Sequence, residues 1–254
     1  MQLSISNLAF TGFNIAELTK LPEHTGIEIF YEFGNPHLWQ EVLSGLYRTG
    51  TQRSLSIHGP CIGINLAEPS HNHYLDYYRQ MLEHAAAWKA EFVVVHTNEG
   101  YAGDPAAVRS LIYERLGRIF ELAGQLDVRI VLENVGLTTK QNLLFDWPDY
   151  QRLLADFPQA GALLDTGHAH INGWPLAEVT ASIGSRLTAC HLHDNDGRAD
   201  LHLPVGEGTI DWSPFFAAIR QSAPETRLVF EYANVSLGAC MKNMQQVSAD
   251  YCLR

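Results

Sequence analysis

The chain of 254 residues is long enough for one large barrel or for two small domains. Hydrophobic residues make up 46% and charged residues 18%, so a sizeable core can form and no segment has the composition of a disordered region. The formal net charge of −11, from 28 acidic and 17 basic residues, disfavours broad attraction to nucleic acid or to an anionic membrane.

The sequence shows no segment typical of export or of a membrane span. It starts MQLSISNLAF, without a basic stretch followed by a long apolar one, and no run approaches the roughly 20 apolar residues of a spanning helix. The four cysteines are widely spaced and include no CxxC pair. We therefore expect a cytoplasmic protein with reduced thiols and no membrane partner.

Short apolar or β-branched runs recur along the chain with amphipathic stretches between them, which predicts βαβ units around a parallel sheet. Helical spacing is clearest over 73–90 and 104–126, where Asp104-Pro105 is a typical helix start. An open doubly wound sheet would carry a GxGxxG or GxxxxGK motif, and neither is present. The expected strands are 3–6, 26–32, 55–59, 92–96, 129–134, 160–165, 187–194 and 227–232. We therefore predict a single (β/α)8 TIM barrel, with residues 1–254 as one domain.

Residues able to do chemistry follow the strands in a regular way. From the third strand onward, nearly every predicted strand carries His, Asp or Glu at its C-terminal end, which is the active-site face of a barrel. They are His58, His96, Glu133, Asp165, His168, His191 and Glu231, joined by Asp200 and His202 from the loop after the seventh strand.

So many charged groups in one small space require a partner. Unpaired carboxylates would repel one another and lose hydration at several kcal/mol each, and a divalent cation removes that cost. Carboxylate oxygens with imidazole nitrogens suit Zn, Mn, Fe or Co. The sequence therefore predicts a divalent metal centre at the mouth of the barrel.

The chain resembles the xylose-isomerase-like barrel superfamily, which includes sugar phosphate isomerases and epimerases and the apurinic endonucleases. VLENVG, LLDTGHAH, HLHDNDG, HLPVGEGTIDW and VFEY carry the resemblance, in the superfamily's order and over nearly the whole chain. By this resemblance Glu133, Asp165, His191 and Glu231 match a four-ligand metal site of the isomerases. The endonuclease-like branch implies five further ligands and up to three ions, at His58, His96, His168, Asp200 and His202.

Two enzymatic functions remain open. As an isomerase or epimerase of a sugar, sugar phosphate or related polyol or ketose, the protein would use its metal to stabilise an enediolate. Glu133 and Glu231 would form the acid/base pair, and His168 would orient a substrate oxygen. His96, His168 and Arg198 are expected to bind substrate, with Arg198 meeting a phosphate or carboxylate.

The alternative is a multi-zinc phosphoester hydrolase, in which clustered metals activate a water. DNA is a poor candidate substrate, because GPCIGIN after His58 lacks a large aromatic wedge and no Lys/Arg-rich loop follows any strand. A third interpretation is a barrel that keeps a metal and binds a ligand without catalysis. We expect the isomerase or epimerase, acting on a small carbohydrate-like molecule, and a homodimer is a further expectation from the superfamily.

Overall fold

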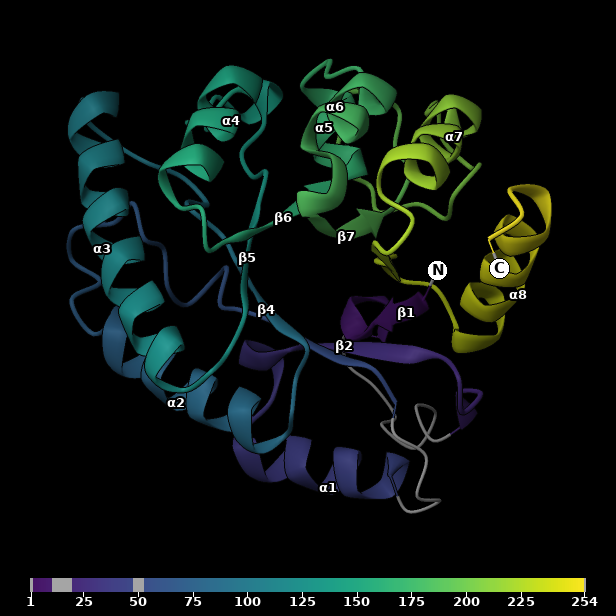
Figure 1. Ribbon diagram of the computed structural model, residues 1–254, viewed down its shortest axis with the longest axis horizontal. Coiled ribbons are helices and arrows are strands. Elements are labelled where there is room, and N and C mark those ends of the chain that lie inside the picture. The colour runs from purple at the N-terminus through teal and green to yellow at the C-terminus, as the bar shows by residue number, and fades with distance from the viewer. Residues whose placement is uncertain (1, 11–19, 48–52, 254) are drawn as a thin grey trace.

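The structure, a computed structural model, describes residues 2–10, 20–47 and 53–253. Its eight strands form a closed parallel barrel in which every strand pairs with its neighbours in chain order and β8 pairs with β1 (Figure 1). The strands are β1 (Gln2–Ser6), β2 (Gly26–Phe30), β3 (Leu55–His58), β4 (Phe92–Val95), β5 (Ile130–Glu133), β6 (Gly161–Asp165), β7 (Leu187–Leu192) and β8 (Arg227–Phe230). The predicted (β/α)8 barrel is confirmed.

Helices surround the strands on the outside of the barrel (Figure 1). They are α1 (Pro36–Leu46), α2 (Tyr74–Ala87), α3 (Pro105–Gln125), α4 (Trp147–Asp156), α5 (Thr166–Ile171), α6 (Leu176–Ile183), α7 (Trp212–Ser222) and α8 (Leu237–Asp250). Two helices follow β6. Between β1 and β2 the described residues contain only short 3-10 structure, including η1 (Asn7–Phe10).

Short polar side chains start several of these helices. Asp104, Asp146 and Asp211 each accept a hydrogen bond from a backbone N–H in the first turn, which satisfies a group that has no partner inside the helix. Proline follows two of these caps within the first two helical positions, where its missing N–H costs nothing. The predicted helix start at Asp104-Pro105 is therefore confirmed.

The observed strands are shorter than predicted at several ends. The strand predicted at 187–194 ends at Leu192, and the one at 227–232 ends at Phe230, so that Glu231 follows its strand. Burial does not mark these ends, because the residues that follow are also buried: His193 and Asp194 after β7, and Glu231 and Tyr232 after β8. The prediction of one domain over residues 1–254 stays a prediction.

Alternating side chains along the strands form two apolar cores. Val93 and Val95 of β4 join the large core under the helices, whereas Phe92 and Val94 pack with Val131 and residues of β6 and β7 in a separate small core. No helix in the described part of the chain is long and apolar enough to cross a membrane. All four cysteines are unpaired, as expected: Cys61, Cys190, Cys240 and Cys252.

Candidate metal centre

The polar side chains predicted at the strand ends come together at the C-terminal mouth of the barrel. His58, Glu133 and Asp165 are the last residues of β3, β5 and β6, and His191 lies in β7. His96 and Glu231 directly follow β4 and β8. Because parallel strands all end at one face, the barrel itself gathers these six side chains.

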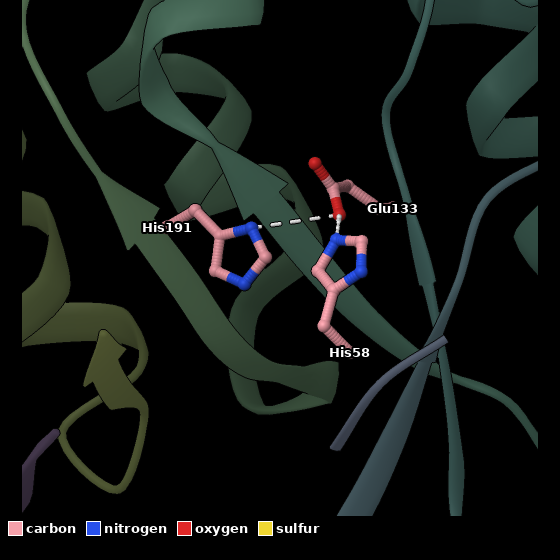
Figure 2. A group of neighbouring side chains, drawn as sticks. All are labelled: His58, Glu133 and His191. Atoms are coloured by element: carbon pink, nitrogen blue, oxygen red, sulfur yellow. Dashed lines mark ion pairs between the residues drawn. The ribbon is translucent and has the colours of Figure 1, made fainter. Parts of the chain in front are cut away.

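Glu133 lies at the centre of this group. Its Oε2 is 3.6 Å from Nε2 of His58 and 3.5 Å from Nδ1 of His191 (Figure 2). The same oxygen is 2.9 Å from Nε2 of His96. The three histidines come from three different strand ends and approach one buried carboxylate oxygen. A single cation at this position would therefore find both charge and lone pairs.

His191 brings three carboxylates together. Its Nδ1 is 3.5 Å from Glu133, 3.4 Å from Glu231 and 3.9 Å from Asp165, and all four side chains are buried. These residues are the four that match the isomerase ligands. Three carboxylates this close repel one another strongly away from water, so the arrangement favours a bound cation.

A second group forms beside this one around Asp200. Its Oδ2 lies 3.4 Å from Nε2 of His168 and 3.5 Å from Nε2 of His202. The backbone of His202 has a φ of 48°, in the left-handed region that non-glycine residues rarely adopt. Strain of this kind concentrates at functional sites.

Asp194 organises the loop that carries Asp200 and His202. Its buried carboxylate accepts hydrogen bonds from the backbone N–H groups of Gly206 and Ile210 and from the indole N–H of Trp212. Asp194 also pairs with Leu203 through two backbone hydrogen bonds. The loop is therefore held close to the end of β7, so it presents Asp200 and His202 without a strand of their own.

Three histidines of the site have one nitrogen held by the backbone and the other aimed at a carboxylate. Nδ1 of His58, His168 and His202 lies 2.8–3.0 Å from the backbone carbonyls of Gly59, Asn134 and Glu231, respectively. A carbonyl only accepts hydrogen bonds, so Nδ1 must carry the proton, and Nε2 is the nitrogen left for a metal.

His96 and His191 are held by carboxylates instead. Nδ1 of His96 is 2.5 Å from Glu99, and Nε2 of His191 is 2.8 Å from Glu28. A carboxylate behind a ligating histidine fixes its orientation and makes it a stronger base. His96 and His191 are therefore better electron donors to a cation than the three histidines held by carbonyls.

Several buried polar atoms at the site have no hydrogen-bond partner. They include Nδ1 of His191, Oε1 of Glu231 and Oδ1 of Asp200. Buried polar atoms are rarely left unsatisfied, because each costs about 1–3 kcal/mol. A divalent cation would satisfy such lone pairs, and the oxygen and nitrogen donors present suit Zn, Mn, Fe or Co. The residues therefore fit the predicted metal.

The two glutamates proposed as an acid/base pair are shifted in opposite directions. Burial would raise the pKa of Glu133, but the charges of His96 and His191 hold it well below its usual value. Burial raises the pKa of Glu231. The charges of His191 and His202 lower it and the charge of Glu133 raises it, so that the net shift is upward. One carboxylate is therefore favoured as the ionised base and the other as the proton carrier.

Two buried residues at the site were not predicted as part of it. Glu28 is the one charged residue in the apolar strand GIEIF, and that charge was the sign in the sequence that could have identified it as part of the site. His193 is not among the predicted ligands, but the structure places its Nε2 2.9 Å from Asp165.

A cavity of about 200 Å³ is lined in part by the candidate ligands, including Glu133 and Glu231. Its lining includes His96 and His168, two of the three predicted substrate-binding residues. Arg198, the third, is exposed and is not among the described residues that line the cavity. The described lining includes Lys140 as its one lysine or arginine, and Phe33 and Ile62 are large apolar side chains exposed at this wall.

Comparison with known proteins agrees with this architecture. The family model described as xylose isomerase-like TIM barrel matches residues 7–250, so the chain belongs to that family. An uncharacterized protein of Methanocaldococcus jannaschii is 25% identical over 200 residues, which is 76% of each chain. A fructoselysine 3-epimerase of Escherichia coli O157:H7 is 23% identical over 137 residues, or 53% of this chain and 50% of the epimerase.

Solved structures share the fold over almost the whole chain. A D-tagatose 3-epimerase-like protein superposes with a TM-score of 0.82 at 19% identity, covering 99% of this chain and 97% of the other. A Thermus thermophilus protein soaked with zinc chloride gives a TM-score of 0.72 at 22% identity, covering 98% and 99%. At these identities the likeness shows the fold, and the activity has to be argued from the site.

Proposed function

We propose that this protein is a divalent-metal-dependent isomerase or epimerase of a sugar or related ketose. The observation that carries the proposal is the placement of Glu133 and Glu231. Both buried carboxylates lie within 3.5 Å of the same nitrogen of His191, although one ends β5 and the other follows β8. Two carboxylates reaching one point from different strands suit a reaction that exchanges a proton between two faces of a carbon.

In this mechanism Glu133, the stronger acid of the two, is ionised and removes the proton from the carbon beside the substrate carbonyl. Glu231 returns a proton to the other face of that carbon, and the reverse reaction exchanges the two roles. A divalent ion held by Glu133, Asp165, His191 and Glu231 would polarise the substrate oxygens and stabilise the enediolate charge. His168 and His96 line the cavity and would orient the hydroxyl groups.

The lining of the cavity favours a substrate without a phosphate. Glu99, Glu133, Asp200 and Glu231 all line it, and Lys140 is the one lysine or arginine in its described lining. A phosphate dianion would meet several carboxylates with little cationic compensation outside the metal. The names of two similar proteins, a fructoselysine 3-epimerase and a D-tagatose 3-epimerase-like protein, agree with a ketose substrate.

The test is proton exchange at the reacting carbon. The metal-loaded protein is incubated in deuterium oxide with a panel of free ketoses and their phosphates, and deuterium incorporation is followed by NMR. Exchange into a free ketose, lost in Glu133→Gln, supports the proposal. If no ketose in the panel takes up deuterium in the presence of Zn, Mn, Co or Fe, the proposal is refuted.

One observation favours a second function, a multi-zinc phosphoester hydrolase. The nine predicted ligands form three groups, each with at least one carboxylate beside imidazole nitrogens: His58, His96 and Glu133; Glu133, Asp165, His191 and Glu231; and His168, Asp200 and His202. Elemental analysis of protein purified without chelator separates the two functions. About one ion per chain supports the epimerase, and two or three zinc or iron ions support the hydrolase.

A further inference from the structure

Glu28 is a fully buried carboxylate to which the proposed mechanism gives no role. It lies in the middle of β2, and its side chain has no exposed surface. A carboxylate inside a barrel costs several kcal/mol unless it is paired and hydrogen-bonded. Its position therefore needs an explanation that packing does not give.

Both oxygens of Glu28 have partners. Oε2 accepts a hydrogen bond of 2.8 Å from the hydroxyl of Ser56 on the neighbouring strand β3, and Oε1 lies 2.8 Å from Nε2 of His191 across the barrel. An ionised carboxylate only accepts hydrogen bonds, so Nε2 of His191 carries a proton. The other nitrogen, Nδ1, then has no hydrogen-bond partner and faces Glu133 and Glu231.

We infer that Glu28 is a positioning residue that makes His191 a metal ligand through Nδ1. The contact with Glu28 fixes the imidazole plane, places the proton on Nε2 and leaves Nδ1 aimed at the three carboxylates. The negative charge behind the ring also makes Nδ1 a stronger donor to a cation. This inference rests on the proposed metal centre, because it assigns to Glu28 an effect on metal affinity.

The structure distinguishes this role from direct ligation. Glu28 contacts Nε2 of His191, whereas Glu133 and Glu231 lie beside Nδ1, and the two nitrogens of an imidazole ring point away from each other. An ion on Nδ1 therefore lies on the side of the ring away from Glu28. Glu28 acts through His191, so its loss should weaken the binding of every ion held by His191 without removing a binding site. A true ligand would lower the number of ions bound.

The test measures zinc binding by competition with a chelator, starting from metal-free protein. Glu28→Gln keeps a hydrogen-bond acceptor for His191 and removes the charge, whereas Glu28→Leu removes both. We expect the number of zinc ions to stay the same while affinity falls roughly 10- to 100-fold in the glutamine variant and further in the leucine variant. Ser56→Ala, which removes the other partner of Glu28 at the same depth of the barrel, should bind zinc nearly as the unchanged protein does.

Histidine ¹⁵N NMR of the zinc-loaded protein gives a second, independent readout. Nε2 of His191 should be protonated in the unchanged protein and in Glu28→Gln, and its signal should shift in Glu28→Leu. Unchanged zinc affinity in Glu28→Gln, a lost zinc equivalent, or an unmoved His191 signal in Glu28→Leu would overturn the inference. If the unchanged protein binds no divalent ion at all, the metal centre itself is wrong.

Discussion

Gly167 and His193 fit together so closely that residue 167 has no room for a side chain. A Cβ placed at Gly167 would lie 1.9 Å from Cε1 of His193. The space left by the glycine lets the buried histidine reach across and contact Asp165, at 2.9 Å. The glycine in LLDTGHAH therefore determines where a neighbour of the metal centre lies.

Gly167→Ala should displace His193 and weaken metal binding. Overpacking a tight buried site costs about 1–3 kcal/mol, and the contact between His193 and Asp165 would be lost. Urea unfolding of the metal-free protein and a zinc titration measure the two effects. Gly117→Ala in α3, where a Cβ meets nothing within 4 Å, is the matched control and should leave both unchanged or slightly improve stability. Equal behaviour of the two variants would contradict the close fit.

Glu133→Gln should abolish activity and weaken metal binding while the barrel stays folded. The amide keeps the volume of the side chain but removes the charge that faces His58, His96 and His191. Circular dichroism checks the fold, and elemental analysis with the deuterium-exchange assay checks the site. Glu114→Gln, on the exposed surface of α3, is the control. Full activity in Glu133→Gln would remove Glu133 from the mechanism.

Metal affinity should rise with pH up to about pH 10. In the metal-free ring, burial would lower the pKa of His96, but the charges of Glu133 and Glu99 raise it from 6.5 to about 10. Burial would also lower the pKa of His202, but Asp200 and Glu231 raise it to about 9. A metal must displace these protons, so binding releases them.

The same pKa shifts determine how the stability of the metal-free protein changes with pH. Because both folded-state pKa values are raised, the stabilisation from these protonated histidines is complete below pH 6.5 and is lost as the pH rises through 9 and 10. Calorimetric zinc titrations in buffers of different ionisation enthalpy count the released protons. His96→Asn should release fewer protons at pH 7. An affinity that does not depend on pH between 6 and 9 would contradict this account.

Asp194→Asn should loosen the loop that carries Asp200 and His202. The amide nitrogen cannot accept from the donors that the carboxylate serves, Gly206 and Trp212 on one oxygen and Ile210 on the other. We expect a loss of about 2–3 kcal/mol in unfolding free energy, as for a buried charged acceptor, and weaker zinc binding. Asp196→Asn, an exposed acceptor in the same loop, is the control. A similar small effect in both variants would show that Asp194 does not hold the loop.

The sequence was sufficient for the barrel because most of the buried strands are apolar runs followed by a polar residue. The same pattern placed His58, Glu133 and Asp165 at the mouth, where the structure finds them. Which residues bind metal stays a prediction.

What the sequence could not supply is orientation. The nitrogen presented by His168, His191 and His202 depends on groups far away along the chain, such as the carbonyl of Asn134 beside His168. His193 was missed because its approach to Asp165 depends on the missing side chain of Gly167. Glu28 was missed because a single carboxylate in GIEIF gives no indication that His191 lies opposite it across the barrel.

The closed barrel, in which β8 pairs with β1, has a consequence for how an ion would bind the candidate site. The candidate ligands run from His58 to Glu231 along the chain, so no short segment of an unfolded polypeptide holds the whole set. The complete site exists only once the strands from β3 to β8 have come together. An ion that binds this site therefore selects the closed barrel and stabilises it by mass action. Ion binding at this site would therefore be linked to folding, and the free ion concentration would help to determine how much of the chain is folded.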